Sequence, residues 1–137
     1  MKKFRILLAE DDPDDKLLLK DAFNSIGAEE FIEFADNGEH VLRKLQDRNT
    51  ELPDLIVVDV NMPKIGGMQT LERLKADQRL KDIPVLIYTT STNPIDEARS
   101  LYLGAKGYII KPSSFKKLIE TARFFMSFIL PPAGSWH

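Results

Sequence analysis

Short apolar runs alternate with amphipathic segments along the whole chain. The most continuous run, Leu55–Val58, has four apolar residues without a polar interruption and is followed directly by Asp59. Such a short, unbroken run indicates a strand that is buried on both faces, as in a parallel sheet. A carboxylate that follows this kind of strand lies at the sheet edge where open α/β proteins bind their ligands. Asp59 is therefore the first candidate functional residue.

The same pattern predicts five pairs of strand and helix. The expected strands are Phe4–Ala9, Phe31–Ala35, Leu55–Asp59, Val85–Thr89 and Gly107–Ile110. The first expected helix is capped by Asp14 or Asp15 and ended by Gly27, and the second is capped by Asn37 and runs through Leu45. The third and fourth are Met68–Ala76 and Ile95–Leu103, the latter followed by Gly104. The fifth is capped by Ser113 or Ser114 and runs to about Leu130. Alternation of this kind predicts an α/β fold with a parallel sheet, helices on both faces and right-handed crossovers.

Composition narrows the classes of function. The chain has 137 residues, which suits one domain, and we expect that domain to span residues 1–130 with a short tail at 131–137. The 19 Lys and Arg residues nearly balance the 21 Asp and Glu residues, so the charge gives no support for nucleic-acid binding. The absence of cysteine excludes disulfides and thiolate chemistry, and no apolar run is long enough to span a membrane. The expected compartment is the cytoplasm.

Polar residues of complementary chemistry follow four of the expected strands. Because the carboxyl ends of parallel strands meet at one edge of a sheet, we expect these side chains to lie together. They are Glu10, Asp11 and Asp12 after the first strand, Asp59 after the third, Thr89 at the end of the fourth and Lys111 after the fifth. Neighbouring carboxylates cannot all ionise without a countercharge, and all-oxygen ligands suit Mg²⁺. Three consecutive acids leave open which of them bind the metal.

These residue types together indicate a phosphoryl-transfer site. The carboxylate of Asp59 would be the nucleophile. Mg²⁺ and Lys111 would neutralise the phosphoryl oxygens, and Thr89 would donate a hydrogen bond to one of them. Asp14 and Asp15 are interpreted first as capping groups, because acids are favoured in the first turn of a helix.

Four short motifs support this interpretation by their order along the chain. They are Glu10-Asp11; Asp59 with Met62-Pro63 and Gly66-Gly67; Pro84 with Thr89-Thr90; and Gly107-Tyr108-Ile109-Ile110-Lys111-Pro112. With these motifs the chain resembles the receiver domains of response regulators in two-component signalling, over about residues 3–130. The resemblance implies a doubly wound, flavodoxin-like fold, in which five helices cover a five-stranded parallel sheet of order 2-1-3-4-5.

The resemblance also implies roles for the acidic residues. Asp59 is the implied phosphoacceptor, which takes a phosphoryl group from a histidine of a sensor kinase or of a phosphotransfer protein. Glu10 and Asp11 are the implied acidic pair, with Asp11 as the more direct Mg²⁺ ligand. Asn61 is expected to add its backbone carbonyl to the metal.

The resemblance implies a lysine and a switch pair as well. Lys111 is expected to pair with the phosphoryl group and to precede a cis peptide bond to Pro112. Thr89 and Tyr108 are the implied switch pair, in which the hydroxyl moves to the phosphate and the aromatic ring turns inward. In energetic terms, phosphate and metal would favour one of two existing packings.

The last expected helix has more aromatic residues than one buried face requires. The apolar positions that share one face are Phe115, Leu118, Ile119, Ala122, Phe125, Met126 and Ile129. Phe124 and Phe128 remain on roughly the opposite face, one turn apart. Either the tail with Trp136 covers them, or they form a surface for a partner or for a second copy of the chain, since exposed aromatic pairs often mark interfaces.

The interpretation leaves no room for an output domain, so we expect a stand-alone regulator that signals by binding a downstream protein. Its segments Glu10–Pro13 and Tyr88–Ser91 are similar to those of regulators associated with phytochrome-type sensor kinases. One alternative is a Mg²⁺-dependent phosphohydrolase with an aspartyl-phosphate intermediate, although its nucleophile normally follows the first strand rather than the third. The other alternative is a binding module that does not need phosphorylation, and the presence of both Asp59 and Lys111 argues against it.

Overall fold

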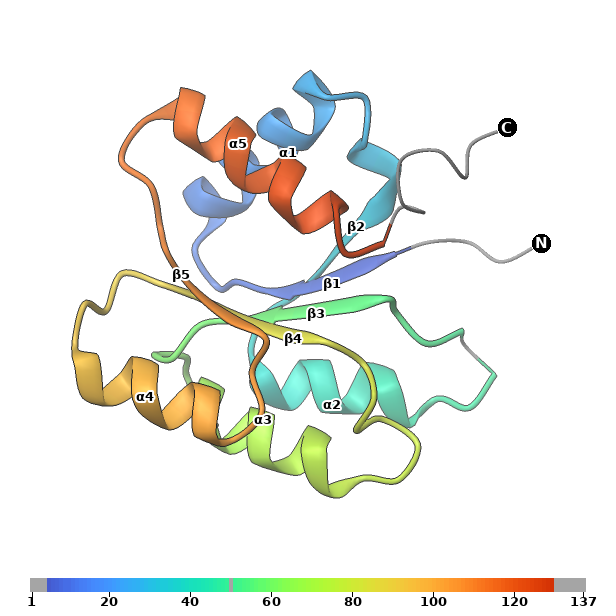
Figure 1. The fold of residues 1–137 in the computed structure, drawn as a ribbon. Helices are drawn as coiled ribbons and strands as arrows, with labels where there is room; N and C mark the ends of the chain where they lie inside the picture. Colours follow the sequence, from blue (N-terminus) through green and yellow to red (C-terminus); the bar gives the residue numbers. More distant parts are fainter. Residues whose placement is uncertain (1–4, 50, 130–137) are drawn as a thin grey trace.

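The computed structural model describes residues 5–49 and 51–129 of the chain (Figure 1). Strands and helices alternate as the sequence pattern predicts, with one additional short 3₁₀ helix. The elements are β1 (Ile6–Ala9), α1 (Pro13–Ser25), the 3₁₀ helix η1 (Glu29–Phe31), β2 (Ile32–Ala35), α2 (Gly38–Gln46), β3 (Leu55–Val58), α3 (Gly67–Ala76), β4 (Val85–Thr89), α4 (Pro94–Tyr102), β5 (Gly107–Ile110) and α5 (Phe115–Met126).

The five strands form one parallel sheet in the order β2-β1-β3-β4-β5. Helices α1 and α5 cover one face of the sheet, and α2, α3 and α4 cover the other (Figure 1). This arrangement confirms the predicted doubly wound fold, and it places the loops that follow β1, β3, β4 and β5 at one edge.

Two apolar layers hold the helices against the sheet, because successive side chains of a strand point to opposite faces. In β3, Val57 packs with Phe23 and Phe125 on the side of α1 and α5. Its neighbours Ile56 and Val58 pack with Leu71 of α3 on the opposite side. Each such side chain, fully removed from water, contributes about 1.5–3 kcal/mol. The burial of β3 on both faces explains its unbroken apolar sequence.

The N-cap of helix α1 lies two or three residues before the predicted caps. The N-cap is Asp12, whose side chain accepts a hydrogen bond from the backbone N–H of Asp14 at 2.8 Å. The prediction of Asp14 or Asp15 as the cap is therefore wrong. The physical reason is Pro13, whose fixed φ and missing N–H suit the first position of a helix. Asp14 and Asp15 lie in the first turn instead.

Other boundaries differ from the prediction by a few residues. Asn37 caps α2 and Ser114 caps α5 as predicted, each by accepting a backbone N–H. Helix α5 ends at Met126 rather than near Leu130. Residue Phe4, the end of the predicted domain at residue 130 and the tail at 131–137 lie outside the described residues. Among the helices of the described ranges, none has the length and apolar character needed to cross a membrane.

Candidate functional site

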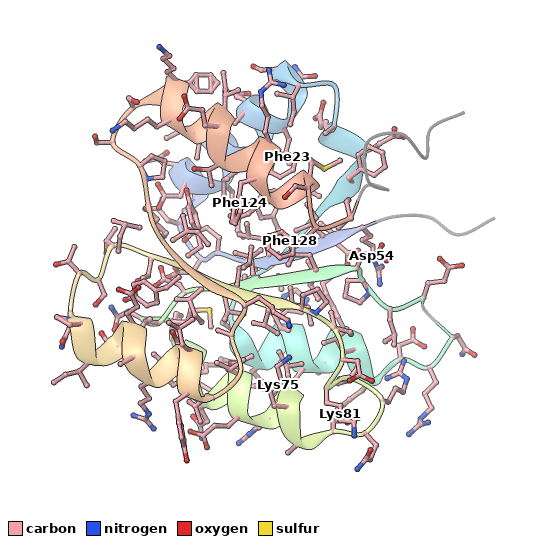
Figure 2. All side chains as sticks on the ribbon, in the orientation of Figure 1. Phe23, Asp54, Lys75, Lys81, Phe124 and Phe128 are labelled. Carbon is pink, nitrogen blue, oxygen red and sulfur yellow. The ribbon has the colours of Figure 1, made fainter. Side chains whose placement is uncertain are left out.

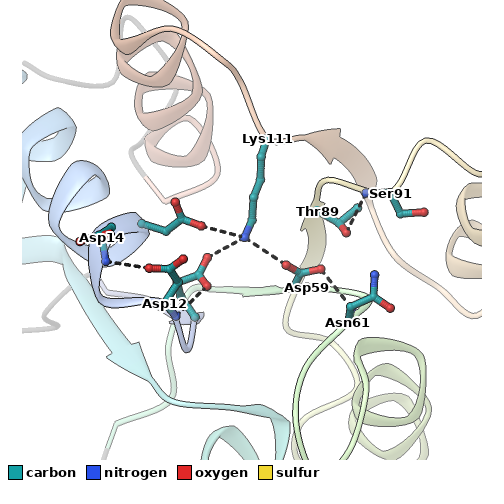
Figure 3. Close-up of polar contacts among 9 residues, drawn as sticks. Asp12, Asp14, Asp59, Asn61, Thr89, Ser91 and Lys111 are labelled. Carbon is teal, nitrogen blue, oxygen red and sulfur yellow. Dashed lines mark hydrogen bonds and ion pairs between the residues drawn. The ribbon is translucent and has the colours of Figure 1, made fainter.

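The predicted site residues gather at the carboxyl edge of the sheet (Figure 3). Glu10 directly follows β1 and donates its backbone N–H to the carbonyl of Ala35 at 2.9 Å. Asp59 directly follows β3, one residue beyond the observed end of the strand. Thr89 is the last residue of β4, and Lys111 follows β5 with its backbone N–H donated to the Thr89 carbonyl at 2.8 Å.

Lys111 is the centre of the charged cluster. Its Nζ lies 2.7 Å from Oε1 of Glu10, 3.1 Å from Oδ2 of Asp59 and 3.4 Å from Oδ2 of Asp15. The lysine side chain is only 13% exposed. The structure thus brings together Glu10, Asp59 and Lys111 as predicted, and it adds Asp15, which the sequence interpretation had treated as a cap.

These carboxylates stabilise the protonated form of Lys111. Burial of the ammonium opposes ionisation, but the hydrogen bond to Glu10 and the charge of Asp59 outweigh it and raise the pKa of Lys111 above its ordinary value. The lysine is therefore fully protonated at neutral pH. The described residues contain no cis peptide bond, so the expectation of a cis bond between Lys111 and Pro112 is wrong.

Tyr88 is a neighbour of Lys111 that the sequence interpretation missed. The lysine Nζ lies 5.5 Å from the centre of the Tyr88 ring, within the range of a cation–π contact. Burial raises the pKa of Tyr88 to about 12. Tyr88 lies in the buried strand β4 directly before Thr89, where the apolar pattern marks it as core and gives no signal of a contact with the site.

The Asp59 side chain has a partner for each oxygen. Oδ1 accepts the backbone N–H of Asn61 at 3.1 Å, and Oδ2 pairs with Lys111. The loop behind it is closed by Gly67, whose N–H donates to the carbonyl of Val60 at 3.1 Å. A side chain on Gly67 would overlap the backbone carbonyl of Asp59, so this glycine is required by close approach. The carboxylate is thereby aimed at the lysine, and its side chain remains 13% exposed at the edge of the sheet.

The three consecutive acids after β1 have three different environments. Glu10 is 3% exposed and accepts the backbone N–H of Asp12 at 3.2 Å with the oxygen that Lys111 does not use. Asp12 is the helix cap. Asp11 is exposed and has no hydrogen-bond or ion-pair partner among the described residues. The acid pair thus divides into a buried partner of the lysine, Glu10, and an open carboxylate, Asp11.

Binding of Mg²⁺ at the carboxyl edge of the sheet would require oxygen ligands from the residues that follow the strands. No group of three or more acid or histidine side chains is arranged to hold a metal within residues 5–49 and 51–129, because Glu10 and Asp59 turn toward Lys111. The donor chemistry still fits Mg²⁺, which keeps several waters and needs only one or two carboxylates. Asp11, Asp59 and the carbonyl of Asn61 follow the adjacent strands β1 and β3 and could supply such a set.

The predicted switch pair is joined through Ser91. The fully buried Thr89 accepts the backbone N–H of Ser91 on its Oγ1 at 3.2 Å. The hydroxyl of Tyr108 donates to the carbonyl of the same serine at 2.9 Å. The Ser91 hydroxyl donates to Oδ2 of Asp96, in the first turn of α4, at 2.7 Å. Ser91 and Asp96 therefore connect Thr89 and Tyr108 to a helix, a link that the sequence pattern alone did not indicate.

The aromatic residues of the last helix only partly follow the prediction. Phe124 is 45% exposed, but Phe128 is partly buried and packs against the core beside α1 and α5 (Figure 2). The two rings form an edge-to-face pair with centroids 5.3 Å apart. Phe128 lies beyond the end of α5 at Met126 and is partly covered, so Phe124 is the more exposed ring of the pair, and a role of the two rings in an interface stays a prediction. Phe115, predicted as core, is 42% exposed at the first turn of α5.

Comparisons with known proteins agree with this geometry. The family profile of the response regulator receiver domain matches residues 6–123. The probable methanogenesis regulatory protein FilR2 of Methanothrix harundinacea is 35% identical over 121 residues, which cover 86% of this chain and 78% of that protein. Another relative is longer: the chain spans 35% of the protein-glutamate methylesterase/protein-glutamine glutaminase of Trichodesmium erythraeum, with 36% identity.

Two solved structures share the fold over nearly their whole length. The phosphorylated cyanobacterial phytochrome response regulator RcpA superposes with a TM-score of 0.85 and 29% identity, covering 96% of this chain and 97% of RcpA. The Mn²⁺-bound response regulator Rcp1 superposes with a TM-score of 0.80 and 28% identity, covering 96% of this chain and all (100%) of Rcp1. Because the family match runs from the first residue of β1 into α5 and includes every strand end of the site, the chain belongs to the response regulator receiver domain family of two-component signalling.

Proposed function

We propose that Asp59 accepts a phosphoryl group from a histidine of a sensor kinase or of a phosphotransfer protein. The observation that carries the proposal is the contact of Lys111 with both Asp59 and the buried Glu10 at the carboxyl edge of the sheet. A fixed cation beside a partly open carboxylate provides what an attacking oxygen and a transferred phosphoryl group need.

The transfer is a displacement at phosphorus. One carboxylate oxygen of Asp59 forms a bond to phosphorus while the bond between phosphorus and the donor histidine nitrogen breaks. The electron pair of that bond stays on the imidazole, which takes up a proton. Lys111 donates to one phosphoryl oxygen, and the hydroxyl of Thr89 donates to another after it turns from Ser91.

Asp11, Asp59 and the backbone carbonyl of Asn61 are the residues that would hold Mg²⁺. The bound metal supplies positive charge that offsets the negative charge of the phosphoryl oxygens. Glu10 supports the site from behind, because its carboxylate fixes the Lys111 ammonium. The Mn²⁺-bound form of Rcp1, which shares this fold, supports a divalent cation in this chain.

The phosphorylated state is read out through Thr89 and Tyr108. When the Thr89 hydroxyl turns to the phosphate, the Ser91 segment and the Tyr108 hydroxyl that bonds to it shift together. The protein catalyses only its own phosphorylation and dephosphorylation, and it signals through the surface that this shift alters. This is a population shift between two packings, and phosphate favours one of them.

The surface beside α5 is the expected place of that readout. A groove runs between β5 and α5 from Lys111 and Pro112 to Phe124, so it connects the site to the exposed aromatic ring. The proposed occupant is a second copy of the chain, with a downstream protein as the other outcome of the test. The proposed donor is a phytochrome-type sensor kinase, a choice supported by the similarity to RcpA and Rcp1.

Intact-mass measurement tests the acceptor. With phosphoramidate and Mg²⁺, the protein is expected to gain one phosphoryl group that hydroxylamine removes, as it cleaves acyl phosphates. The gain should disappear in Asp59→Asn and remain in Asp21→Asn, a control on the exposed side of α1. A full gain in Asp59→Asn would contradict the assignment. Turnover of small phosphate esters would instead favour the phosphohydrolase.

A further inference from the structure

Asp15 is a carboxylate of the site that the phosphoryl chemistry does not use. It lies in the first turn of α1, where Asp12 already supplies the cap. Its Oδ2 is 3.4 Å from Nζ of Lys111, and its side chain is 40% exposed. Its neighbour Asp14 shares the same helical turn but is exposed, and its side chain has no contact with the lysine among the described residues.

Three carboxylates saturate the Lys111 ammonium in this state. An ammonium has three N–H donors, and Glu10, Asp59 and Asp15 are its three acceptors. Breaking the contact between Glu10 and Lys111 would cost much free energy, because Glu10 is 3% exposed and would become an unpaired buried charge. Asp15 makes the longest of the three contacts and has water available. It is therefore the acceptor that can be exchanged at the lowest cost.

Phosphorylation changes the charge that faces Asp15. A phosphoryl group carries about −1.5 to −2 charges and three strong acceptor oxygens, in place of one carboxylate charge. These oxygens compete with Asp15 for the Lys111 ammonium. The added negative charge of the phosphoryl group also repels the Asp15 carboxylate, which contacts the same ammonium. The contact between Asp15 and Lys111 is thus more favourable before phosphorylation than after it.

We propose that Asp15 is a positioning residue that holds Lys111 in the unphosphorylated protein and opposes phosphorylation of Asp59. This inference rests on the proposed function, because it concerns the rate at which that site is loaded. The contact with Asp15 opposes the movement of the Lys111 ammonium toward the phosphoryl oxygens. Its loss should therefore change the maximal rate of phosphorylation, kcat. A general repulsion between the acidic edge and an anionic donor would instead raise KM, and it would be shared by Asp14.

The test compares Asp15→Asn with Asp14→Asn, which remove the same charge from the same helical turn. Initial phosphorylation rates are measured with phosphoramidate and saturating Mg²⁺ over a range of donor concentrations. Asp15→Asn is expected to raise kcat about 2- to 5-fold, the size typical of a partly exposed ion pair. Asp14→Asn is expected to leave kcat unchanged. Asp15→Glu keeps the carboxylate and should restore the original rate.

The outcomes separate this inference from the proposed function. If the unaltered protein gains no phosphate, the proposed function fails and the inference fails with it. If it does gain phosphate, an equal effect of the two Asn variants, a change confined to KM, or a slower Asp15→Asn variant overturns the role of Asp15 alone. A faster Asp15→Glu variant would also overturn the role of Asp15. Because this variant keeps the negative charge, a change in helix geometry rather than the loss of charge would then explain the faster phosphorylation.

Discussion

Glu10 and Lys111 form the shortest ion pair of the site, with 2.7 Å between Oε1 and Nζ. The two residues follow β1 and β5, which are not neighbours in the sheet, because β3 and β4 lie between them. The pair therefore spans the carboxyl edge above two strands and links residues 101 positions apart in the sequence. It holds the two ends of the edge together around Asp59.

The ion pair between Glu10 and Lys111 is expected to stabilise the folded protein. Lys111→Met should lower the free energy of unfolding by about 2–4 kcal/mol, because it leaves Glu10 as a buried carboxylate without a cation. The double variant Glu10→Gln/Lys111→Met should recover part of that loss, since the most deeply buried carboxylate of the site is then neutral and only Asp59, whose side chain is 13% exposed, lacks its cation. Urea unfolding without Mg²⁺ measures both. An equal loss in the single and double variants would show that lost packing, rather than the uncompensated charge, is responsible.

Gly67 is expected to be indispensable for the position of Asp59. Gly67→Ala would place a methyl group on the Asp59 carbonyl, so the loop must move, at a cost of about 1–3 kcal/mol. Because small displacements of a nucleophile reduce rates strongly, phosphorylation by phosphoramidate should slow by about tenfold or more. Gly66→Ala is the matched control, since its added carbon would lie 3.1 Å from the Val60 carbonyl. Similar rates in the two variants would refute the role of close approach.

The hydroxyl of Tyr108 is expected to hold the loop after β4. Tyr108→Phe removes the hydrogen bond to the Ser91 carbonyl and should cost about 1 kcal/mol. Hydrogen exchange should become faster in residues 90–96, while the mass gain at Asp59 should persist. Tyr102→Phe, at an 89% exposed tyrosine of α4, provides the control. Unchanged exchange in Tyr108→Phe would mean that Ser91 is held by Asp96 alone.

The sequence predicts the site well where topology decides the outcome. Asp59 and Lys111 could be placed together because each follows an apolar strand, and parallel strands end at one edge. The cap at Asp12 was also accessible, since Pro13 marks the first position of a helix. Acids are favoured both at the cap and in the first turn of a helix, so Asp14 and Asp15 do not by themselves mark where α1 begins.

Contacts that depend on side-chain direction could not be predicted in this way. Asp15 reaches Lys111 only because α1 begins at Pro13, which turns that position toward the sheet edge. Ser91 joins Thr89 and Tyr108 through its backbone N–H and carbonyl. Every residue except proline has both groups, so the identity of residue 91 does not predict this contact. Phe128 lies two residues beyond the end of α5 at Met126, where the helical period no longer applies, and this helps to explain why it packs partly against the core.

Phe124 is expected to take part in phosphorylation-dependent association. Phe124→Ala should cost about 0.5–1.5 kcal/mol of stability through the lost edge-to-face contact with Phe128. If a second copy docks here, light scattering should show a larger species of the unaltered protein after phosphodonor is added, and Phe124→Ala should weaken it. Phe115→Ala, an exposed aromatic at the other end of α5, is the control. A species that forms equally in Phe124→Ala would place the contact elsewhere.

Glu33 forms a charged cluster on the edge strand β2, away from the site. Its carboxylate accepts hydrogen bonds from Lys44 at 2.8 Å and from Arg5 at 2.9 Å. Partial burial opposes ionisation, but the hydrogen bond from Lys44 and the charges of Arg5 and Lys44 outweigh it, so the pKa of Glu33 lies below its ordinary value of 4.5. The folded protein therefore binds this proton less readily than the unfolded chain.

The pH dependence of stability follows from the lowered pKa of Glu33. Its contribution is fully present above pH 4.5 and is lost as the pH falls through the lower pKa of the folded state. Glu33→Gln should thus reduce the free energy of unfolding by about 0.5–1 kcal/mol at pH 7. The difference from the unaltered protein should shrink below pH 4.5, as measured by urea unfolding, and Glu30→Gln on η1 should show no such trend. A difference that stays constant with pH would mean that amide packing, rather than the charge of Glu33, causes the loss.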